Sequence, residues 1–197
     1  MFTNLSRNTI HQHYMRLALM QAEKSLGNTK ENPSVGCVIV KKDCVISCGH
    51  TSFNGRPHAE KNAISSSKEK IKNCFLYVTL EPCSHFGKTP PCVNLISRKK
   101  FQQVFISIAD PDVRSFNKSI KKLKNNGVKV KIGILSDKIK KFYNSYLIYK
   151  KEFLPFVTCK LAVSKDYYSI NKKNEWITNE ESRGRVHLMR STHDCIL

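Results

Sequence analysis

Hydrophobic and polar positions along the first 150 residues follow two patterns. One repeats every three or four residues, as amphipathic helices do, and the other consists of short apolar runs typical of buried strands. The helical pattern covers residues 13–26, 59–67, 93–99, 115–126 and 137–150. The apolar runs cover residues 34–40, 44–49, 75–80, 104–108 and 128–135. An opening hairpin followed by alternating strands and helices predicts an α/β fold, with a mixed central sheet between two layers of helices.

The pattern changes after residue 151. The later elements are an apolar strand at 156–163, a further element starting at Trp176, a helix at 179–190 and the start of a strand at 194–197. Fewer than fifty residues cannot bury an independent α/β core. We therefore expect a first domain over residues 1–151 and an incomplete piece of a second domain over residues 152–197.

Composition narrows the class of protein. Hydrophobic residues make up 40% of the 197 positions, which is enough for a proper core and excludes global disorder. The formal net charge of +19 raises the question of a nucleic-acid partner. Most of the basic residues are lysine rather than arginine, whereas an RNA-contact surface favours arginine for its planar fork. We expect a compositional origin for the charge and no nucleic-acid partner, although a basic surface helps to attract an anionic ligand.

The cysteines and the chain's hydropathy indicate a reducing compartment. Residues 1–8 lack the apolar core of a signal peptide, and the longest apolar stretch, 35–40, is far shorter than the ~20 residues that span a bilayer. A cytoplasmic protein without a membrane partner is expected. Six of the eight cysteines lie in or beside apolar segments and are expected to be small hydrophobic residues: Cys37, Cys44, Cys48, Cys74, Cys159 and Cys195.

The remaining two cysteines belong to a chemical site. The segment that follows directly on the strand predicted at 75–80 places Cys83 at the carboxyl end of this strand and Cys92 at the start of the next predicted helix. Ligands of α/β folds bind beyond the carboxyl ends of the strands, and a helix N-terminus favours the metal-binding thiolate. His58 opens another helix, and Glu60 follows two residues later.

One histidine and two cysteines provide three zinc ligands and leave the fourth position for water, as in catalytic zinc sites. Zinc makes that water acidic enough to react near neutral pH, and Glu60 is the expected proton shuttle. The alternative is a closed structural site with His85 as the fourth ligand, which would leave Glu60 without a role.

Longer stretches around these residues resemble the bifunctional riboflavin-biosynthesis deaminase/reductase family. The matching pieces are Met15-Arg-Leu-Ala-Leu, Asn32-Pro-Ser-Val-Gly-Cys-Val-Ile-Val, His58-Ala-Glu and Tyr77-Val-Thr-Leu-Glu-Pro-Cys-Ser-His-Phe-Gly-Lys-Thr-Pro-Pro-Cys92. General cytidine and adenosine deaminases space their cysteines as Pro-Cys-x-x-Cys. The eight-residue gap between Cys83 and Cys92 is typical of the riboflavin branch.

The resemblance implies a cytidine-deaminase-like αβα sandwich that binds one zinc ion. It also implies hydrolytic deamination of 2,5-diamino-6-(5-phosphoribosylamino)pyrimidin-4-one to the aminouracil and ammonia. The partner is then a small phosphorylated aminopyrimidine, and Asn32, His85 and Lys88 are expected to line its pocket. An assembly of several copies is left open.

The chain departs from the family pattern at the pocket rim and in the tail. Thr51 occupies the place of a family histidine, with His50 one position earlier. Asp112-Val113 replaces a family Asn-Pro, and Asn117-Lys-Ser replaces a family Gly-Arg-Gly. In the tail, Ser-Lys-Asp166-Tyr-Tyr replaces a family Ser-Leu-Asp-Gly-Lys. From Pro155 onward the chain resembles the start of an NADPH-dependent reductase domain, with Trp176-Ile-Thr and Arg190 matching. Nearly all of that domain is missing, so NADPH use is not expected and a separate reductase protein is the expected source of that step.

Two rival functions remain at this point. A tRNA or nucleic-acid deaminase would suit the positive charge but not the long loop between Cys83 and Cys92. A non-catalytic zinc-bearing remnant that binds a reductase or RNA would suit the altered tail. The retention of His58 and Glu60 beside both cysteines argues against it.

Overall fold

The computed structural model of this chain describes residues 7–169 and 176–197. It divides into two compact units, Met1–Leu154 and Pro155–Leu197. The first six residues of the segment 1–8, in which no signal peptide is expected, lie outside the described residues. The border expected between the two domains, after residue 151, stays a prediction.

The first unit is built on a five-stranded mixed sheet with the order β2-β1-β3-β4-β5. Its strands are β1 Gly36–Lys41, β2 Cys44–His50, β3 Phe75–Leu80, β4 Gln103–Ile108 and β5 Lys129–Ile132. β1 is antiparallel to both β2 and β3, whereas β3, β4 and β5 are parallel. The predicted hairpin and the mixed sheet are confirmed.

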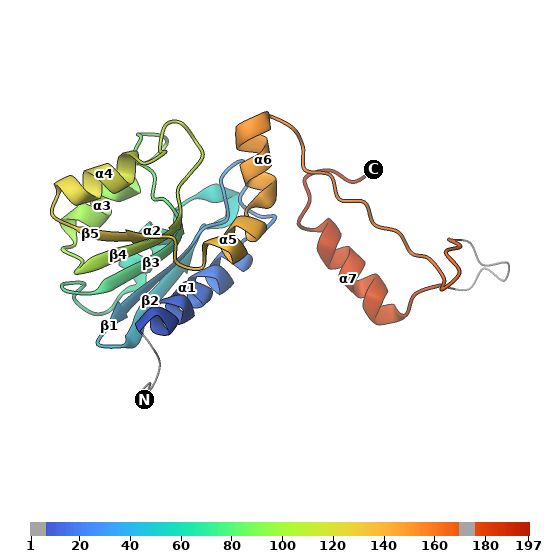
Figure 1. Cartoon of the computed structure of the whole chain (residues 1–197), viewed down its shortest axis with the longest axis horizontal. Coiled ribbons are helices and arrows are strands. Elements are labelled where there is room, and N and C mark those ends of the chain that lie inside the picture. The colour runs from blue at the N-terminus through green and yellow to red at the C-terminus, as the bar shows by residue number, and fades with distance from the viewer. Residues whose placement is uncertain (1–6, 170–175) are drawn as a thin grey trace. The chain divides into compact units, whose positions relative to one another are not determined.

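Helices cover both faces of this sheet (Figure 1). They are α1 Arg7–Glu23, α2 Ala59–Ser66, α3 Cys92–Arg98, α4 Lys118–Asn125, α5 Ser136–Phe142 and α6 Asn144–Glu152. One hydrophobic core lies between the sheet and α2, α3 and α4, and the other lies between the sheet and α1 and α5. The two cores lie on opposite faces of the sheet, so the central strands are buried on both faces. This confirms the two expected layers of helices.

The strand directions bring four segments to one edge of the sheet. β2, β3 and β4 all end at this edge, and β1 starts there, because Cys37 of β1 pairs with Val78 near the end of β3. Gly49 near the end of β2 lets α2 come close. A Cβ at this position would lie 2.4 Å from the carbonyl oxygen of Ala59. The N-terminus of α2 is therefore held directly against the sheet edge.

The helix predicted over residues 137–150 is wrong as a single element. The chain forms α5 and α6, with a break at Tyr143. The buried Tyr143 hydroxyl donates a hydrogen bond to the carbonyl oxygen of Ser34 at 2.9 Å and contacts the hydroxyl of Thr79 at 2.7 Å. These contacts tie the break to the sheet, which helical periodicity does not reveal.

Other element limits also differ from the prediction. α1 begins at Arg7 rather than at residue 13 and ends at Glu23 rather than at residue 26. α4 begins at Lys118 rather than at residue 115, because Asn117 has a positive φ of 55° and its backbone amide donates to the carboxylate of Glu81. β5 ends at Ile132 rather than at residue 135, and Gly133 follows with a φ of 92°. A residue with a positive φ does not continue a strand.

The second unit contains the predicted helix but not the predicted strands. α7 spans Glu180–Arg190, and the side chain of its N-cap residue Asn179 accepts a hydrogen bond from the amide of Ser182 at 2.9 Å. Residues 156–163 and 194–197 belong to no helix or strand. Their apolar sequence predicted strands, yet within the described part of this unit no neighbouring strand pairs with them, so no ladder forms.

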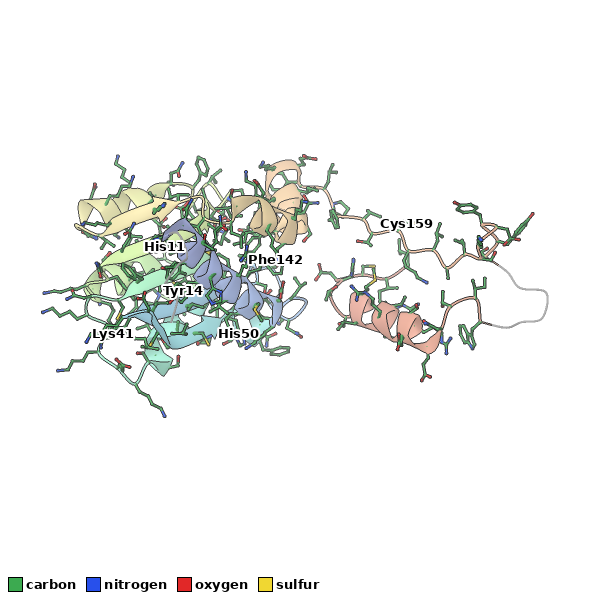
Figure 2. All side chains as sticks on the ribbon, turned by 60° about the horizontal axis from the view of Figure 1, so that its bottom comes forward. His11, Tyr14, Lys41, His50, Phe142 and Cys159 are labelled. Carbon is green, nitrogen blue, oxygen red and sulfur yellow. The ribbon has the colours of Figure 1, made fainter. Side chains whose placement is uncertain are left out.

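The expectation for the six cysteines outside the site is correct for two of them. Cys37 and Cys74 are buried in the first unit. Cys44 and Cys48 are exposed on the edge strand β2, and Cys159 is exposed on the extended segment of the second unit (Figure 2). Cys195 is also exposed. Apolar neighbours in the sequence therefore do not bury a thiol that lies on an edge strand or outside any strand.

Over the residues that the structure describes, every helix is too short or too polar to cross a membrane.

Candidate metal centre

His58, Cys83 and Cys92 meet at the sheet edge described above. Their side-chain ligand atoms all lie within 4.8 Å of one another. Nδ1 of His58 is 3.6 Å from Sγ of Cys83 and 3.4 Å from Sγ of Cys92. His58 is the N-cap residue of α2 and Cys92 is the first residue of α3, so two helix N-termini and the end of β3 converge here.

This spacing is that of a tetrahedral zinc site. Zn–S and Zn–N bonds of about 2.3 and 2.0 Å at tetrahedral angles place sulfur and nitrogen about 3.5 Å apart. The two observed nitrogen–sulfur distances bracket this value. His85 is not part of the group, and its Nδ1 lies 3.3 Å from Oγ of Ser115 instead. The arrangement therefore gives no support to a closed site with His85 as the fourth ligand.

Glu60 lies in the first turn of α2 and is only 3% exposed. Burial raises the pKa of its carboxyl group to about 7, while the charge of His58 opposes this rise. The carboxyl group also interacts with Cys92. A buried carboxyl beside the cluster with a pKa near neutrality is able both to accept and to release a proton.

The two cysteines influence each other directly. The hydrogen bond from the Cys92 thiol, with further help from His58, lowers the pKa of Cys83 to about 4. The backbone amide of Cys92 also donates to Sγ of Cys83 at 3.2 Å. The hydrogen bond to Cys83 raises the pKa of His58. The site therefore favours the thiolate of Cys83, which is the form that ligates metals.

Glu81 supports the loop that carries Cys83, a role that sequence reasoning did not assign. Its carboxylate accepts hydrogen bonds from the amides of Asp110, Asn117 and Ser119 at 3.2, 3.0 and 3.1 Å. Burial raises the pKa of Glu81, and these backbone hydrogen bonds oppose the rise. The only sequence cue was its place directly before Pro82-Cys83. Glu81 thus fixes the end of β3 to the loop after β4 and to the start of α4.

Thr51, which occupies the place of a family histidine, is buried and bonded to the backbone. Its hydroxyl accepts a hydrogen bond from the amide of Val35 at 2.9 Å and donates one to the carbonyl oxygen of Pro33 at 3.1 Å. These residues follow Asn32, whose side chain packs so closely on Gly55 that a Cβ there would lie 2.3 Å from Nδ2. Thr51 therefore supports the segment of Asn32 and is not itself free for a ligand.

The other departure, Asp112, is likewise engaged within the protein. Its carboxylate accepts hydrogen bonds from Nε and Nη2 of Arg114 at 2.8 and 2.6 Å and from Nζ of Lys150 at 3.2 Å. The Arg114 guanidinium, followed by Lys150, holds the pKa of Asp112 well below its usual range. Of the expected pocket residues, His85 is half-buried beside Ser115, and Lys88 is exposed on the loop between the two cysteines.

Comparisons with known proteins agree with this geometry. Residues 8–108 match the model of the cytidine and deoxycytidylate deaminase zinc-binding region. Riboflavin biosynthesis protein RibD of Aquifex aeolicus is 36% identical over 95% of this chain and 53% of its own length. The RibD of Bacillus amyloliquefaciens is 37% identical over 95% of this chain and 51% of its own. This chain thus spans about half the length of the curated relatives that it matches.

Solved structures show the same relationship. The Acinetobacter baumannii RibD structure, form 2, matches with a TM-score of 0.85 at 36% identity, over 95% of this chain and 53% of that one. The Thermotoga maritima diaminohydroxyphosphoribosylaminopyrimidine deaminase/5-amino-6-(5-phosphoribosylamino)uracil reductase matches with a TM-score of 0.87 at 36% identity, over 94% of this chain and 54% of that one. The cytidine-deaminase-like fold expected from the sequence is confirmed.

Proposed function

We propose that this chain, which belongs to the family of the cytidine and deoxycytidylate deaminase zinc-binding region, is a zinc-dependent deaminase. Its proposed substrate is an aminopyrimidine of riboflavin biosynthesis. The proposed reaction converts 2,5-diamino-6-(5-phosphoribosylamino)pyrimidin-4-one and water into 5-amino-6-(5-phosphoribosylamino)uracil and ammonia. The observation that carries the proposal is the meeting of His58, Cys83 and Cys92 beside buried Glu60. The riboflavin-biosynthesis relatives, matched over 95% of this chain, support this choice of substrate.

His58, Cys83 and Cys92 would hold the zinc ion, because their donor set and spacing fit tetrahedral coordination. When bound, zinc supplies the Lewis acidity that makes water a competent nucleophile near neutral pH. The three ligands leave one position of a tetrahedron free of protein, as a catalytic site requires. The paired helix N-termini of α2 and α3 favour the negative charge of the thiolates at this position.

Glu60 carries the proton transfers of the proposed reaction. Addition of water to the amino-bearing ring carbon forms a carbon–oxygen bond, and Glu60 moves one water proton to the adjacent ring nitrogen. It then moves the remaining hydroxyl proton to the amino group, the carbon–nitrogen bond breaks, and ammonia leaves. Because Glu60 is buried beside the metal ligands, bulk water does not compete for these protons.

Asn32, His85 and Lys88 are proposed to bind the substrate. An amide suits the edges of the pyrimidine ring, and the cationic or donor groups of His85 and Lys88 suit an anionic ligand. The tail, residues 152–197, is proposed to be a piece of a reductase-like domain and, by itself, not to use NADPH. Reduction of the ribosyl product would then fall to a separate protein, and both steps belong to the cytoplasm.

The test is to incubate the purified, zinc-loaded protein with the diaminopyrimidine phosphate, with and without NADPH, and to identify the products by mass spectrometry. We expect ammonia and the ribosyl aminouracil in equal amounts, with no consumption of NADPH. Release of ammonia from deoxycytidylate or tRNA but not from the diaminopyrimidine would overturn the proposed substrate. Formation of the ribityl compound would overturn the interpretation of the tail.

A further inference from the structure

Arg56 joins the two segments that carry the metal ligands. It lies two residues before His58, and its Nη1 donates a hydrogen bond to the hydroxyl of Thr89 at 2.6 Å. Thr89 lies three residues before Cys92. The other terminal nitrogen, Nη2, passes within 3.2 Å of the Cβ position at Gly87. The half-buried Arg56 therefore lies along the loop between Cys83 and Cys92.

The charge of Arg56 is not neutralised by a carboxylate. Among the described residues its hydrogen-bond partner is the neutral hydroxyl of Thr89, and no ion pair joins it to an acidic group. The basic groups of Arg114 and Lys150, in contrast, are both engaged by Asp112. A guanidinium has five N–H donors, so Arg56 retains most of its donors for a ligand.

We propose that Arg56 is a specificity-determining residue that binds the phosphate group of the substrate. The inference rests on the proposed function, in which the reacting ring lies at the metal ligands and the phosphate stands at the far end of the phosphoribosyl arm. The planar fork of an arginine matches the oxygens of a phosphate. Lys88, which precedes Thr89 on the loop between Cys83 and Cys92, offers a second positive charge.

The hydrogen bond to Thr89 fixes the position of the Arg56 side chain before a ligand binds. A long side chain that is already fixed loses less conformational freedom on binding, so the interaction with an anion is stronger than that of a freely moving lysine. The same bond could serve only to hold the loop. The two roles differ in one respect: only phosphate binding depends on whether the substrate carries a phosphate.

The experiment compares kcat/KM for the phosphorylated substrate and for its dephosphorylated form. Four variants are used: R56Q, R56K, T89V and the control R98Q, which makes the same charge change at the exposed far end of α3. Loss of a charge-assisted hydrogen bond predicts that R56Q lowers kcat/KM about 10- to 100-fold for the phosphorylated form alone. R56K should lose less, because it keeps the charge without the fork. T89V should lose part of the preference for phosphate, because Arg56 is then no longer held in place, whereas R98Q should keep it.

An equal loss on both substrate forms in R56Q would overturn the proposal, because it would assign Arg56 a purely structural role. Binding of ribose 5-phosphate against ribose, measured by calorimetry on the zinc-loaded protein, provides a readout that needs no turnover. Wild type should prefer the phosphate ester, and R56Q should lose this preference. Absence of ammonia release from either substrate in wild type would refute the proposed function. Equal ribose 5-phosphate binding by wild type and R56Q would refute the role of Arg56.

Discussion

Asp112 and Lys150 form an ion pair of 3.2 Å that links the loop after β4 to α6. A second contact runs beside it, because the hydroxyl of Tyr146 donates a hydrogen bond to Oδ1 of Asp110 at 2.9 Å. The loop also contacts the segment of Cys83, since the Ser84 hydroxyl donates to the carbonyl oxygen of Arg114 at 3.0 Å. α6 therefore supports the segment that carries Cys83, although it carries none of the predicted site residues.

Replacement D112N should lower the free energy of unfolding by about 1–2 kcal/mol, because it removes charge-assisted hydrogen bonds to Arg114 and Lys150. The effect is modest because solvent screens the largely exposed Arg114. The Asp112 pKa is lower in the folded protein than in the unfolded chain. Its stabilisation is thus present above the usual aspartate pKa of about 4 and is lost as the pH falls below that value. Urea unfolding of both proteins between pH 7 and pH 3 should show the difference shrinking with acid. A difference that grows in acid would contradict the assignment.

The metal assignment predicts about one zinc per chain in wild type and none in C83S, which should also lose deamination. C48S is the matched control, because Cys48 is an exposed thiol outside the cluster. Elemental analysis of the purified proteins measures this directly. Stoichiometric zinc in C83S would show that the ion is held elsewhere.

E60Q should separate catalysis from binding. The amide keeps the shape of the side chain but cannot shuttle protons, so the rate should fall by roughly 10² to 10⁴ while zinc remains bound. Steady-state ammonia release and metal analysis on the same sample test both parts. Turnover close to wild type would move the proton transfers to another group.

Tyr143 should be important for stability rather than for chemistry. Y143F removes the hydroxyl that bonds the Ser34 carbonyl, and leaving this buried acceptor without a partner should cost about 1–3 kcal/mol. Y149F is the control on the same stretch, because Tyr149 is 53% exposed. Thermal unfolding of both variants should show a lower midpoint for Y143F alone. Equal midpoints would mean that the break between α5 and α6 is stabilised in another way.

Deletion of Pro155–Leu197 should leave zinc content and deamination largely intact, because this segment forms a compact unit of its own. A longer deletion that starts at Asn144 also removes the contacts of Tyr146 and Lys150 with the loop after β4. The longer deletion should lower both stability and activity. If the shorter deletion abolished activity on its own, the tail would have to contribute to the site.

The sequence alone determined most elements of the first unit and the proposed metal ligands of this protein. β3 occupies residues 75–80 as its apolar run predicts, and Cys83 and Cys92 lie at the end of β3 and the start of α3. These features are local: periodicity reports which face of an element is buried. Cys83 lies three residues after β3, and Cys92 is the first residue of α3. The family resemblance rests on the same contiguous stretches.

Only the tertiary structure decided the features that depend on distant partners. The break at Tyr143 is anchored to Ser34, 109 residues away in the chain, and Glu81 binds amides that are 29 to 38 residues distant. The apolar run 156–163 forms no strand, since a strand requires a partner that no local pattern can supply. A hydrogen bond depends on where two chain segments meet, and that position is set by the packing of the whole sheet and its helices.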